Sequence, residues 1–377
     1  APRILKKQSA PPGVTGKPMK SLKLHLAALF LPALLAAAPA PASPDAPPAA
    51  YGGLPQVEGF VAEMAARGLD ADWVRQTLAE AQRLEAVRNA VMPLPAGQRK
   101  DWQAYRQRFV EPGRTEAGRR FLQEHAETLA RARDQFGVPV EVIVGILGVE
   151  TYYGRNTGRY RVVDALATLA FDYPAESGRD RSAYFREQLG EFFAWCAKER
   201  CQPLEIKGSY AGAMGLPQFM PGNIHLYGTD FDGDGRIDLD NPADAIGSVA
   251  RFLARHGWVR GLNPVFSVGV GGARLAPLLA PDILPTFTPE QLETLGAEPL
   301  AALPPREAYA LVELQNGGAG SEYVLGSRNF FTLTRYNRSS YYAMAVLQLG
   351  REVVAQAAAA ADLPEREPNT AGGCAQC

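Results

Sequence analysis

The apolar stretch over residues 138–154 carries a carboxylate, Glu150, near its end. Pro139 suits the first turn of a helix, where its missing N–H costs nothing, and Gly154 suits the end. Helical spacing puts Ile146 and its apolar neighbours on the face that Glu150 shares. The valine and isoleucine content also permits a buried strand, but the length, about a dozen residues, favours a helix.

An apolar helix face is an unfavourable place for a charge. Loss of solvation there raises the pKa of a carboxyl group, which is how an enzyme keeps a general acid protonated near neutral pH. Glu150 is therefore a candidate catalytic acid. The alternative is that it marks the solvated end of a buried helix.

Helical spacing of apolar residues recurs from Leu54 to about Phe136, and residues 115–136 predict one long amphipathic helix. This charged region has no catalytic pattern and is interpreted as a scaffold. Further helices are predicted at 184–201 and 340–361, with a helix start at Thr288. Shorter apolar runs predict a small group of strands at 264–269, 308–314 and 321–325.

The region from Met19 to Ser43 has a basic start, an apolar centre and small residues before Ser43, which is typical of a secretory signal. We expect cleavage after Ala42 and a soluble periplasmic protein, with an uncleaved anchor as the alternative. No cysteine lies near the cleavage region, so a lipid anchor is not expected. Residues 1–18 are interpreted as an upstream extension and 43–53 as a Pro/Ala-rich linker.

A formal net charge of -1 provides no long-range field for nucleic acid or an anionic membrane, so those partners are not expected. The chain has four cysteines, Cys196, Cys201, Cys374 and Cys377. Four cysteines can pair into disulfides in three ways. Cys196 and Cys201 lie too far apart in an unbroken helix, but Pro203 favours an earlier helix end that lets them meet. The last two cysteines stand in a tail, 362–377, that we expect to be unstructured.

An acidic loop begins at Asp230 and gives the strongest local motif. Carboxylates at loop positions one, three, five and nine, with glycine at six, match an EF-hand calcium loop: Asp230, Asp232, Asp234 and Asp238. Arg236 at position seven would bind through its carbonyl oxygen. Asn241 replaces the usual glutamate at position twelve and, before Pro242, predicts a helix cap. Asp244 then becomes the last carboxylate of a structural calcium site, and a metal-free turn is the alternative.

Three segments together resemble the lytic murein transglycosylase B family: 148–154, 207–221 and 334–345. The resemblance covers residues 55–360 and includes the calcium loop. It implies a mainly α (α+β) protein in which a lysozyme-like core is flanked by a helical domain and a small β-containing domain. The corresponding boundaries are 54–136 for the helical domain, 137–261 for the core, 262–330 for the β-containing domain and 331–361 for the closing segment.

The resemblance also implies that Glu150 is the single catalytic acid/base and that five residues line a saccharide groove: Ser209, Gln218, Tyr336, Asn337 and Tyr342. Each has a structural alternative, such as a turn cap for Ser209, a backbone bridge for Gln218 and core packing for the tyrosines. Gly222 departs from the family, which often has serine there.

The implied reaction is non-hydrolytic cleavage of peptidoglycan to 1,6-anhydromuramoyl products. Most glycosidases use two carboxylates, and the next two after Glu150 in the chain, Asp164 and Asp172, stand outside the family motifs. A lysozyme-type hydrolase and a non-catalytic, calcium-dependent glycan-binding protein are the alternatives. The expected partners are glycan strands and other cell-wall enzymes, and we expect a monomer.

Overall fold

The structure is a computed structural model that describes residues 51–93 and 99–361. The predictions for the signal segment, its cleavage, the extension and the tail with Cys374 and Cys377 lie outside the described residues. In the described part most residues are helical and the strands are few, which confirms the mainly α fold class. None of the described helices is long and apolar enough to cross a membrane.

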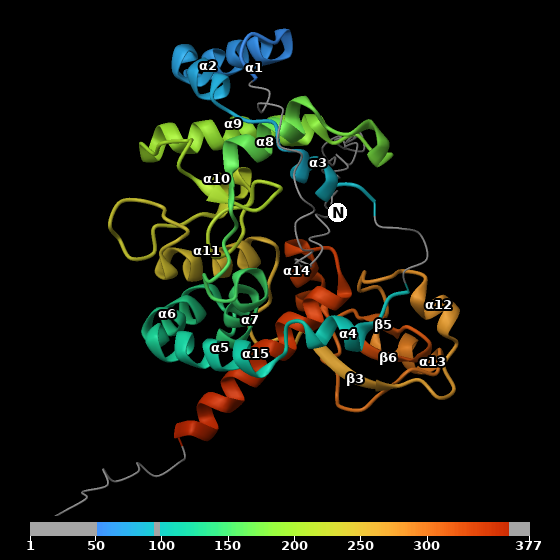
Figure 1. Cartoon of the computed structure of the whole chain (residues 1–377). Helices are drawn as coiled ribbons and strands as arrows, with labels where there is room; N and C mark the ends of the chain where they lie inside the picture. Colours follow the sequence, from blue (N-terminus) through green and yellow to red (C-terminus); the bar gives the residue numbers. More distant parts are fainter. Residues whose placement is uncertain (1–50, 94–98, 362–377) are drawn as a thin grey trace, which may run out of the picture.

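One end of the molecule is a pair of helices packed on a second pair (Figure 1). The first pair comprises α1 (Pro55–Ala66) and α2 (Ala71–Ala79), and the second α8 (Val162–Phe171) and α9 (Ser182–Glu199). Aromatic rings join the pairs, because Phe60 contacts Phe171 and Phe193 at centroid distances of 5.8 and 6.0 Å. Edge-to-face contacts of this kind add to the burial of the rings.

The centre of the fold is α7 (Val140–Thr151), which packs closely on α15 (Ser340–Ala361). Glycines permit this approach: a Cβ added to Gly145 would overlap the carbonyl of Val346, and one on Gly350 would overlap the carbonyl of Glu141. Three helices surround the pair, namely α5 (Pro112–Glu124), α6 (Ala126–Phe136) and α11 (Pro242–Arg255). The shorter helices are α3 (Glu85–Ala90), α4 (Trp102–Gln107), α10 (Pro221–Tyr227), α14 (Arg328–Tyr336) and the 3-10 turn Ala175–Ser177.

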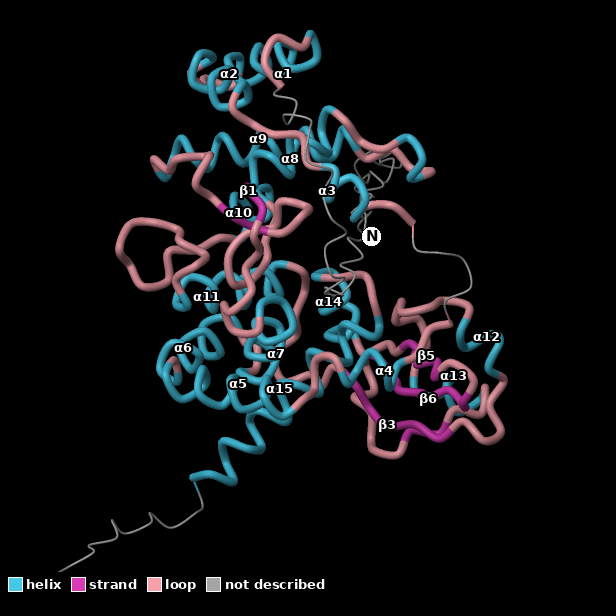
Figure 2. The backbone as a smooth tube through the Cα atoms, viewed as in Figure 1, coloured by secondary structure: helices cyan, strands magenta, loops and turns pink. Residues whose placement is uncertain are grey.

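A small antiparallel sheet with the order β4-β3-β6-β5 forms a separate layer beside α12 and α13 (Figure 2). Its elements are β3 (Val265–Gly269), α12 (Leu275–Leu279), α13 (Pro289–Thr294), β4 (Glu298–Pro299), β5 (Ala310–Asn316) and β6 (Ala319–Gly326). It has its own core of six buried residues: Leu278, Leu292, Ala297, Tyr309, Leu311 and Leu325. The three predicted strands and the helix start at Thr288, which forms a capping box with Gln291, are confirmed.

Two predictions about helix boundaries are wrong. The single helix expected at 115–136 is two helices, because the backbone of His125 leaves the helical region, with φ -113° and ψ 24°. The His125 ring packs on Phe121 at 4.5 Å, and Phe121 in turn contacts Tyr153 at 5.3 Å, so the break lies beside a tertiary contact. The central helix ends at Thr151 rather than at Gly154, since Tyr152 and Tyr153 both adopt left-handed backbone angles.

Cys196 and Cys201 form a disulfide with a Cα–Cα distance of 4.8 Å. Helix α9 ends at Glu199 and Arg200 turns left-handed, which brings Cys201 back toward Cys196. The sequence allowed this pairing only if the helix ended early, and the structure meets that condition. The predicted cap at Asn241 is also confirmed, because its side-chain oxygen accepts the N–H of Ala243 at the start of α11.

Candidate active site

Glu150 lies in the last turn of α7 and is half-buried. Tyr342, on the first turns of α15, donates its hydroxyl hydrogen to Oε1 of Glu150 at 2.6 Å. The Tyr342 side chain is only 2% exposed. The close crossing of α7 and α15 therefore places a buried donor directly on the candidate acid.

Burial raises the pKa of Glu150 from 4.5 to about 7, and the hydrogen bond from Tyr342 partly opposes this rise. Burial also raises the pKa of Tyr342 far above its usual value, and the adjacent Glu150 carboxylate adds to the effect. Tyr342 thus remains a hydrogen donor at every pH at which the protein works. Glu150 is divided between its acid and base forms near neutral pH, which suits a group that first donates and then accepts a proton.

A second tyrosine stacks on the first. The rings of Tyr336 and Tyr342 are 6.3 Å apart and inclined by 14°, and Tyr336 donates its hydroxyl hydrogen to the carbonyl of Pro217 at 2.6 Å. Burial and the Glu150 charge raise the pKa of Tyr336 as well. Asn337 follows directly at the end of α14 and is half-buried. The structure therefore brings two of the five predicted groove residues, Tyr336 and Tyr342, to Glu150, and the place of Asn337 in the groove stays a prediction.

The other two predicted groove residues, Ser209 and Gln218, hold their own loop together. Ser209 accepts the N–H groups of Ala211 and Ala213 at 3.3 and 3.0 Å. Gln218 donates from Nε2 to the carbonyls of Thr157 and Gly215 at 2.9 and 3.0 Å. These are the turn-cap and backbone-bridge alternatives that the sequence left open. These hydrogen bonds fix the loop. A contact of Ser209 or Gln218 with sugar stays a prediction.

Thr151 joins this loop to α7. Its hydroxyl donates to the carbonyl of Leu216 and accepts the N–H of Gly154, both at 3.0 Å. Two left-handed residues, Tyr152 and Tyr153, lie between these anchors. Non-glycine residues rarely adopt such angles unless the surroundings impose them. The end of α7 is thus held in one conformation on both sides of the turn.

The two carboxylates that follow Glu150 in the chain are engaged elsewhere. Asp164 is buried and pairs with Arg161 at 2.7 Å. Asp172 pairs with Arg83 and with Arg88. Both therefore stabilise the packing around α8. Neither is free to act as a second catalytic carboxylate.

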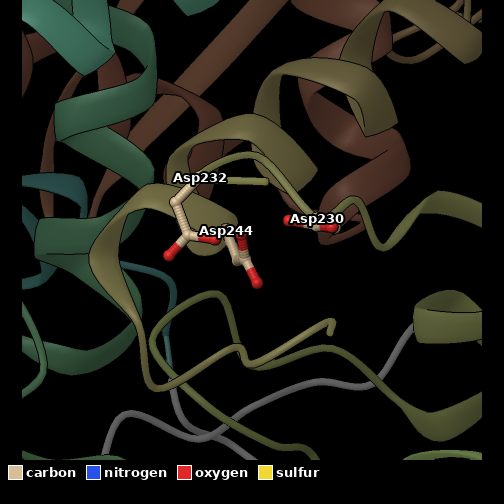
Figure 3. Close-up of side chains that lie close together, drawn as sticks. All are labelled: Asp230, Asp232 and Asp244. Atoms are coloured by element: carbon tan, nitrogen blue, oxygen red, sulfur yellow. The ribbon is translucent and has the colours of Figure 1, made fainter. Parts of the chain in front are cut away.

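The acidic loop gathers three of the predicted metal ligands (Figure 3). Oxygens of Asp230, Asp232 and Asp244 all lie within 4.8 Å of one another. Asp244 is buried and accepts the N–H groups of Phe231 and Asp238. Such oxygen ligands suit calcium. Asp234 is not in the group; its carboxylate accepts the N–H of Arg236, and both residues are exposed.

Sequence reasoning missed Tyr105, which lies on α4 in the region interpreted as a scaffold. Burial raises its pKa, and the charge of Glu150 contributes to the rise. Its ring also packs on Tyr341 at 5.7 Å. A single tyrosine in a charged helical segment carries no spacing signal, so only the tertiary fold identifies it.

The family model described as the transglycosylase SLT domain matches residues 53–351. The chain belongs to this family. It is 40% identical over 309 residues to the membrane-bound lytic murein transglycosylase B of Escherichia coli strain K12, covering 79% of this chain and 82% of the relative. These matches confirm the resemblance seen in the three sequence motifs.

Solved structures of lytic transglycosylases match the fold. The catenated lytic transglycosylase SltB1 from Pseudomonas aeruginosa has a TM-score of 0.74 and 41% identity, covering 81% of this chain and 99% of that one. Escherichia coli Slt35, solved in complex with calcium, has a TM-score of 0.72 and 38% identity, with 81% and 95% covered. SltB3 from Pseudomonas aeruginosa, solved with NAG-NAM-pentapeptide, has a TM-score of 0.70 and 29% identity, with 79% of each chain covered.

Proposed function

We propose that the protein is a lytic transglycosylase that cleaves the β-1,4 bond between N-acetylmuramic acid and N-acetylglucosamine in peptidoglycan without consuming water. The observation that carries the proposal is a single half-buried carboxyl group, Glu150, with a pKa of about 7 and a buried tyrosine donor on it. Membership of the transglycosylase family supports the substrate class.

In the proposed reaction Glu150 first protonates the glycosidic oxygen as the bond breaks. The N-acetyl group of the muramic acid stabilises the oxocarbenium-like centre, which makes a second protein carboxylate unnecessary. Glu150, now ionised, accepts the proton of the sugar's own 6-hydroxyl group, and that oxygen closes the 1,6-anhydro ring. Protons balance, because Glu150 gives one proton to the leaving oxygen and takes one from the 6-hydroxyl group. A pKa of about 7 suits both half-steps.

The remaining site residues bind and orient the substrate in this proposal. The hydrogen bond from Tyr342 holds the Glu150 carboxyl group in one orientation. The ring of Tyr336 stacks on that of Tyr342 and holds it in place. Asn337, Ser209 and Gln218 line the saccharide groove, where amide and hydroxyl groups complement sugar hydroxyls. The loop that carries the last two is already fixed by its internal hydrogen bonds, so little ordering is needed when substrate binds.

The acidic loop is proposed to hold one structural calcium ion, as in an EF-hand. Asp230, Asp232 and Asp244 supply the carboxylates, with Asp234 and the Arg236 carbonyl completing the set. The support is the converging aspartates and the calcium complex of the related Slt35. A bound ion would tie the loop to the start of α11, because Asp244 lies in the first turn of that helix. It takes no part in the reaction.

The proposed location is the periplasm, after removal of the amino-terminal signal. The proposed partners are peptidoglycan strands, with SltB3 as a relative solved with a glycan–peptide fragment. A monomer suffices, because α7 and α15 of one chain together supply Glu150 and its donor. The proposed domain boundaries remain those between residues 136 and 137, 261 and 262, and 330 and 331.

The decisive experiment is mass analysis of the muropeptides that the purified protein releases from peptidoglycan sacculi. The proposal expects fragments that end in 1,6-anhydro-N-acetylmuramic acid, lighter by one water than hydrolysis products. Reducing-end fragments would identify a lysozyme-type hydrolase instead. Release of no fragment, with glycan binding retained, would identify a binding protein. The rate of product release by the Glu150→Gln variant should be lower than that of the wild type by a factor of about 10² or more.

A further inference from the structure

The loop that follows the catalytic turn carries a local excess of positive charge. Residues 151–161 include three arginines and no acidic residue, although the whole chain has a formal net charge of -1. Arg161 is paired with Asp164. Arg155 and Arg159 are exposed, and no carboxylate among the described residues forms an ion pair with either. Two cations are thus left for an outside partner.

This loop is attached to the proposed groove. The carbonyl of Thr157 accepts a hydrogen bond from Gln218 at 2.9 Å. Gly158, at a φ of 111°, lies so close to Gly208 that a Cβ there would overlap the Gly208 carbonyl, next to Ser209. Along the chain, Arg155 lies before these two contact points and Arg159 after them. They therefore stand at the edge of the part of the groove that Ser209 and Gln218 form.

Neighbouring rings hold both guanidinium groups. Arg155 lies 4.9 Å from the ring centroid of Tyr152, and Arg159 lies 5.4 Å from that of Tyr160. Arg159 also donates from one Nη to the Tyr160 hydroxyl at 3.4 Å. A guanidinium over a ring can still offer its other N–H groups to a carboxylate. Such stacking also lowers the entropy cost of holding the side chain in place.

The protein's own acids near this loop are occupied. Glu111, which lies near Tyr152, accepts the N–H groups of Gly113 and Arg114 with its two carboxylate oxygens, at 2.7 Å each. Glu150 is engaged by Tyr342, and its raised pKa reduces its charge near neutral pH. Neither carboxylate forms an ion pair with Arg155 or Arg159.

We propose that Arg155 and Arg159 form a carboxylate-binding subsite at the edge of the groove, which recognises the acidic substituent of a muramic acid residue. The inference rests on the proposed function. The carboxylate belongs either to the peptide stem or, where the peptide has been removed, to the lactyl group that carried it. A glycan of N-acetylglucosamine alone has no such group, so the subsite selects peptidoglycan over neutral polymers of the same backbone.

The test measures binding in a Glu150→Gln background, so that no probe is consumed. Three probes are titrated calorimetrically: NAG-NAM-pentapeptide, the same disaccharide with a free lactyl carboxylate, and a neutral chitooligosaccharide. Replacing both arginines by glutamine should weaken binding of the acidic probes by about 3- to 10-fold, the range for two exposed charge pairs, and leave the neutral probe unchanged. Added salt should weaken acidic-probe binding in the parent and have little effect in the double variant.

Two further variants complete the design. Arg306→Gln removes an exposed arginine from the β-containing layer and should change nothing. Replacing both arginines by lysine keeps the charge but loses the two-pronged donor, so it should recover part of the affinity. A loss confined to the pentapeptide probe assigns the subsite to the carboxylates of the stem. A loss confined to the probe with the free lactyl carboxylate assigns it to the lactyl position, and an equal loss for both shows that the arginines accept either carboxylate.

Equal affinities of parent and double variant for all probes would overturn the proposal, as would an equal loss for the neutral probe. The outcome is separate from that for the proposed function, which rests on the anhydro products of the unmodified enzyme. If the enzyme forms anhydro products but binds acidic and neutral probes with equal affinity, the proposed function stands and the proposed subsite is wrong.

Discussion

Replacing Glu150 with glutamine should stabilise the folded protein at alkaline pH while it abolishes turnover. The folded pKa is about 7 against a usual value of 4.5, so the folded state binds the proton more tightly than the unfolded chain does. Stability from this group is complete below about pH 4.5 and is lost as the pH rises toward 7. Above pH 7 the folded protein has to keep an ionised carboxylate in a poorly solvated place.

The difference between 4.5 and about 7 corresponds to about 3 kcal/mol at full ionisation. This is an upper limit, because the residue is half-buried and the ionised form keeps its hydrogen bond from Tyr342. Glutamine has the same size and its carbonyl oxygen can still accept that bond, but it carries no charge. The variant should therefore gain up to about 3 kcal/mol over the wild type at pH 8.5 and nothing at pH 4.5.

The assay is urea unfolding of both proteins at a series of pH values between 4.5 and 8.5, followed by circular dichroism. The matched control is Glu352→Gln, an exposed position on the same helix as Tyr342, which should give curves parallel to the wild type. A Glu150→Gln protein whose advantage does not grow with pH would show that Glu150 is well solvated. The explanation of its acid role by burial would then be wrong.

Three further predictions concern other parts of the site. Tyr342→Phe removes a hydrogen bond that lowers the pKa of Glu150, so the alkaline limb of the pH–rate profile should move to higher pH; an unchanged limb would count against the contact. Calcium at about 100 times its dissociation constant should raise wild-type stability by about 2.7 kcal/mol, and Asp230→Asn should reduce this gain in thermal melts; equal shifts would exclude Asp230 as a ligand. Gly350→Ala should cost about 1–3 kcal/mol in urea unfolding, whereas Gly271→Ala, whose Cβ meets nothing within 4 Å, should cost little.

The elements that the sequence predicted well are those whose signals are local. Helix α15 begins at Ser340 and ends at Ala361 as expected, since a long apolar periodicity is hard to satisfy in any other way. The cap at Asn241 followed by Pro242 was equally clear, because the capping bond joins residues two apart. The sequence left the disulfide as one of three possible pairings, because it depends on where α9 ends.

The features that escaped prediction depend on contacts between distant residues. No glycine or proline marks the break at His125. Tyr105 comes within range of the Glu150 charge only because α4 packs against α15. Glu150 itself was identified from its apolar surroundings. The donor that holds it is 192 positions away in the chain, and no spacing rule reaches so far. Only the family motif indicated that this tyrosine belongs to the site.

The pKa of Glu150 is a consequence of how two helices cross. Gly145 and Gly350 let α7 and α15 approach until backbone meets backbone, and the side chains on the adjoining turns are then pressed together. Glu150 and Tyr342 lie on those turns, so the packing that stabilises the core also removes water from the carboxyl group. A larger residue at either glycine would separate the helices and readmit water, which should lower the pKa of Glu150 toward 4.5. The acid function and the core packing are therefore set by the same pair of glycines.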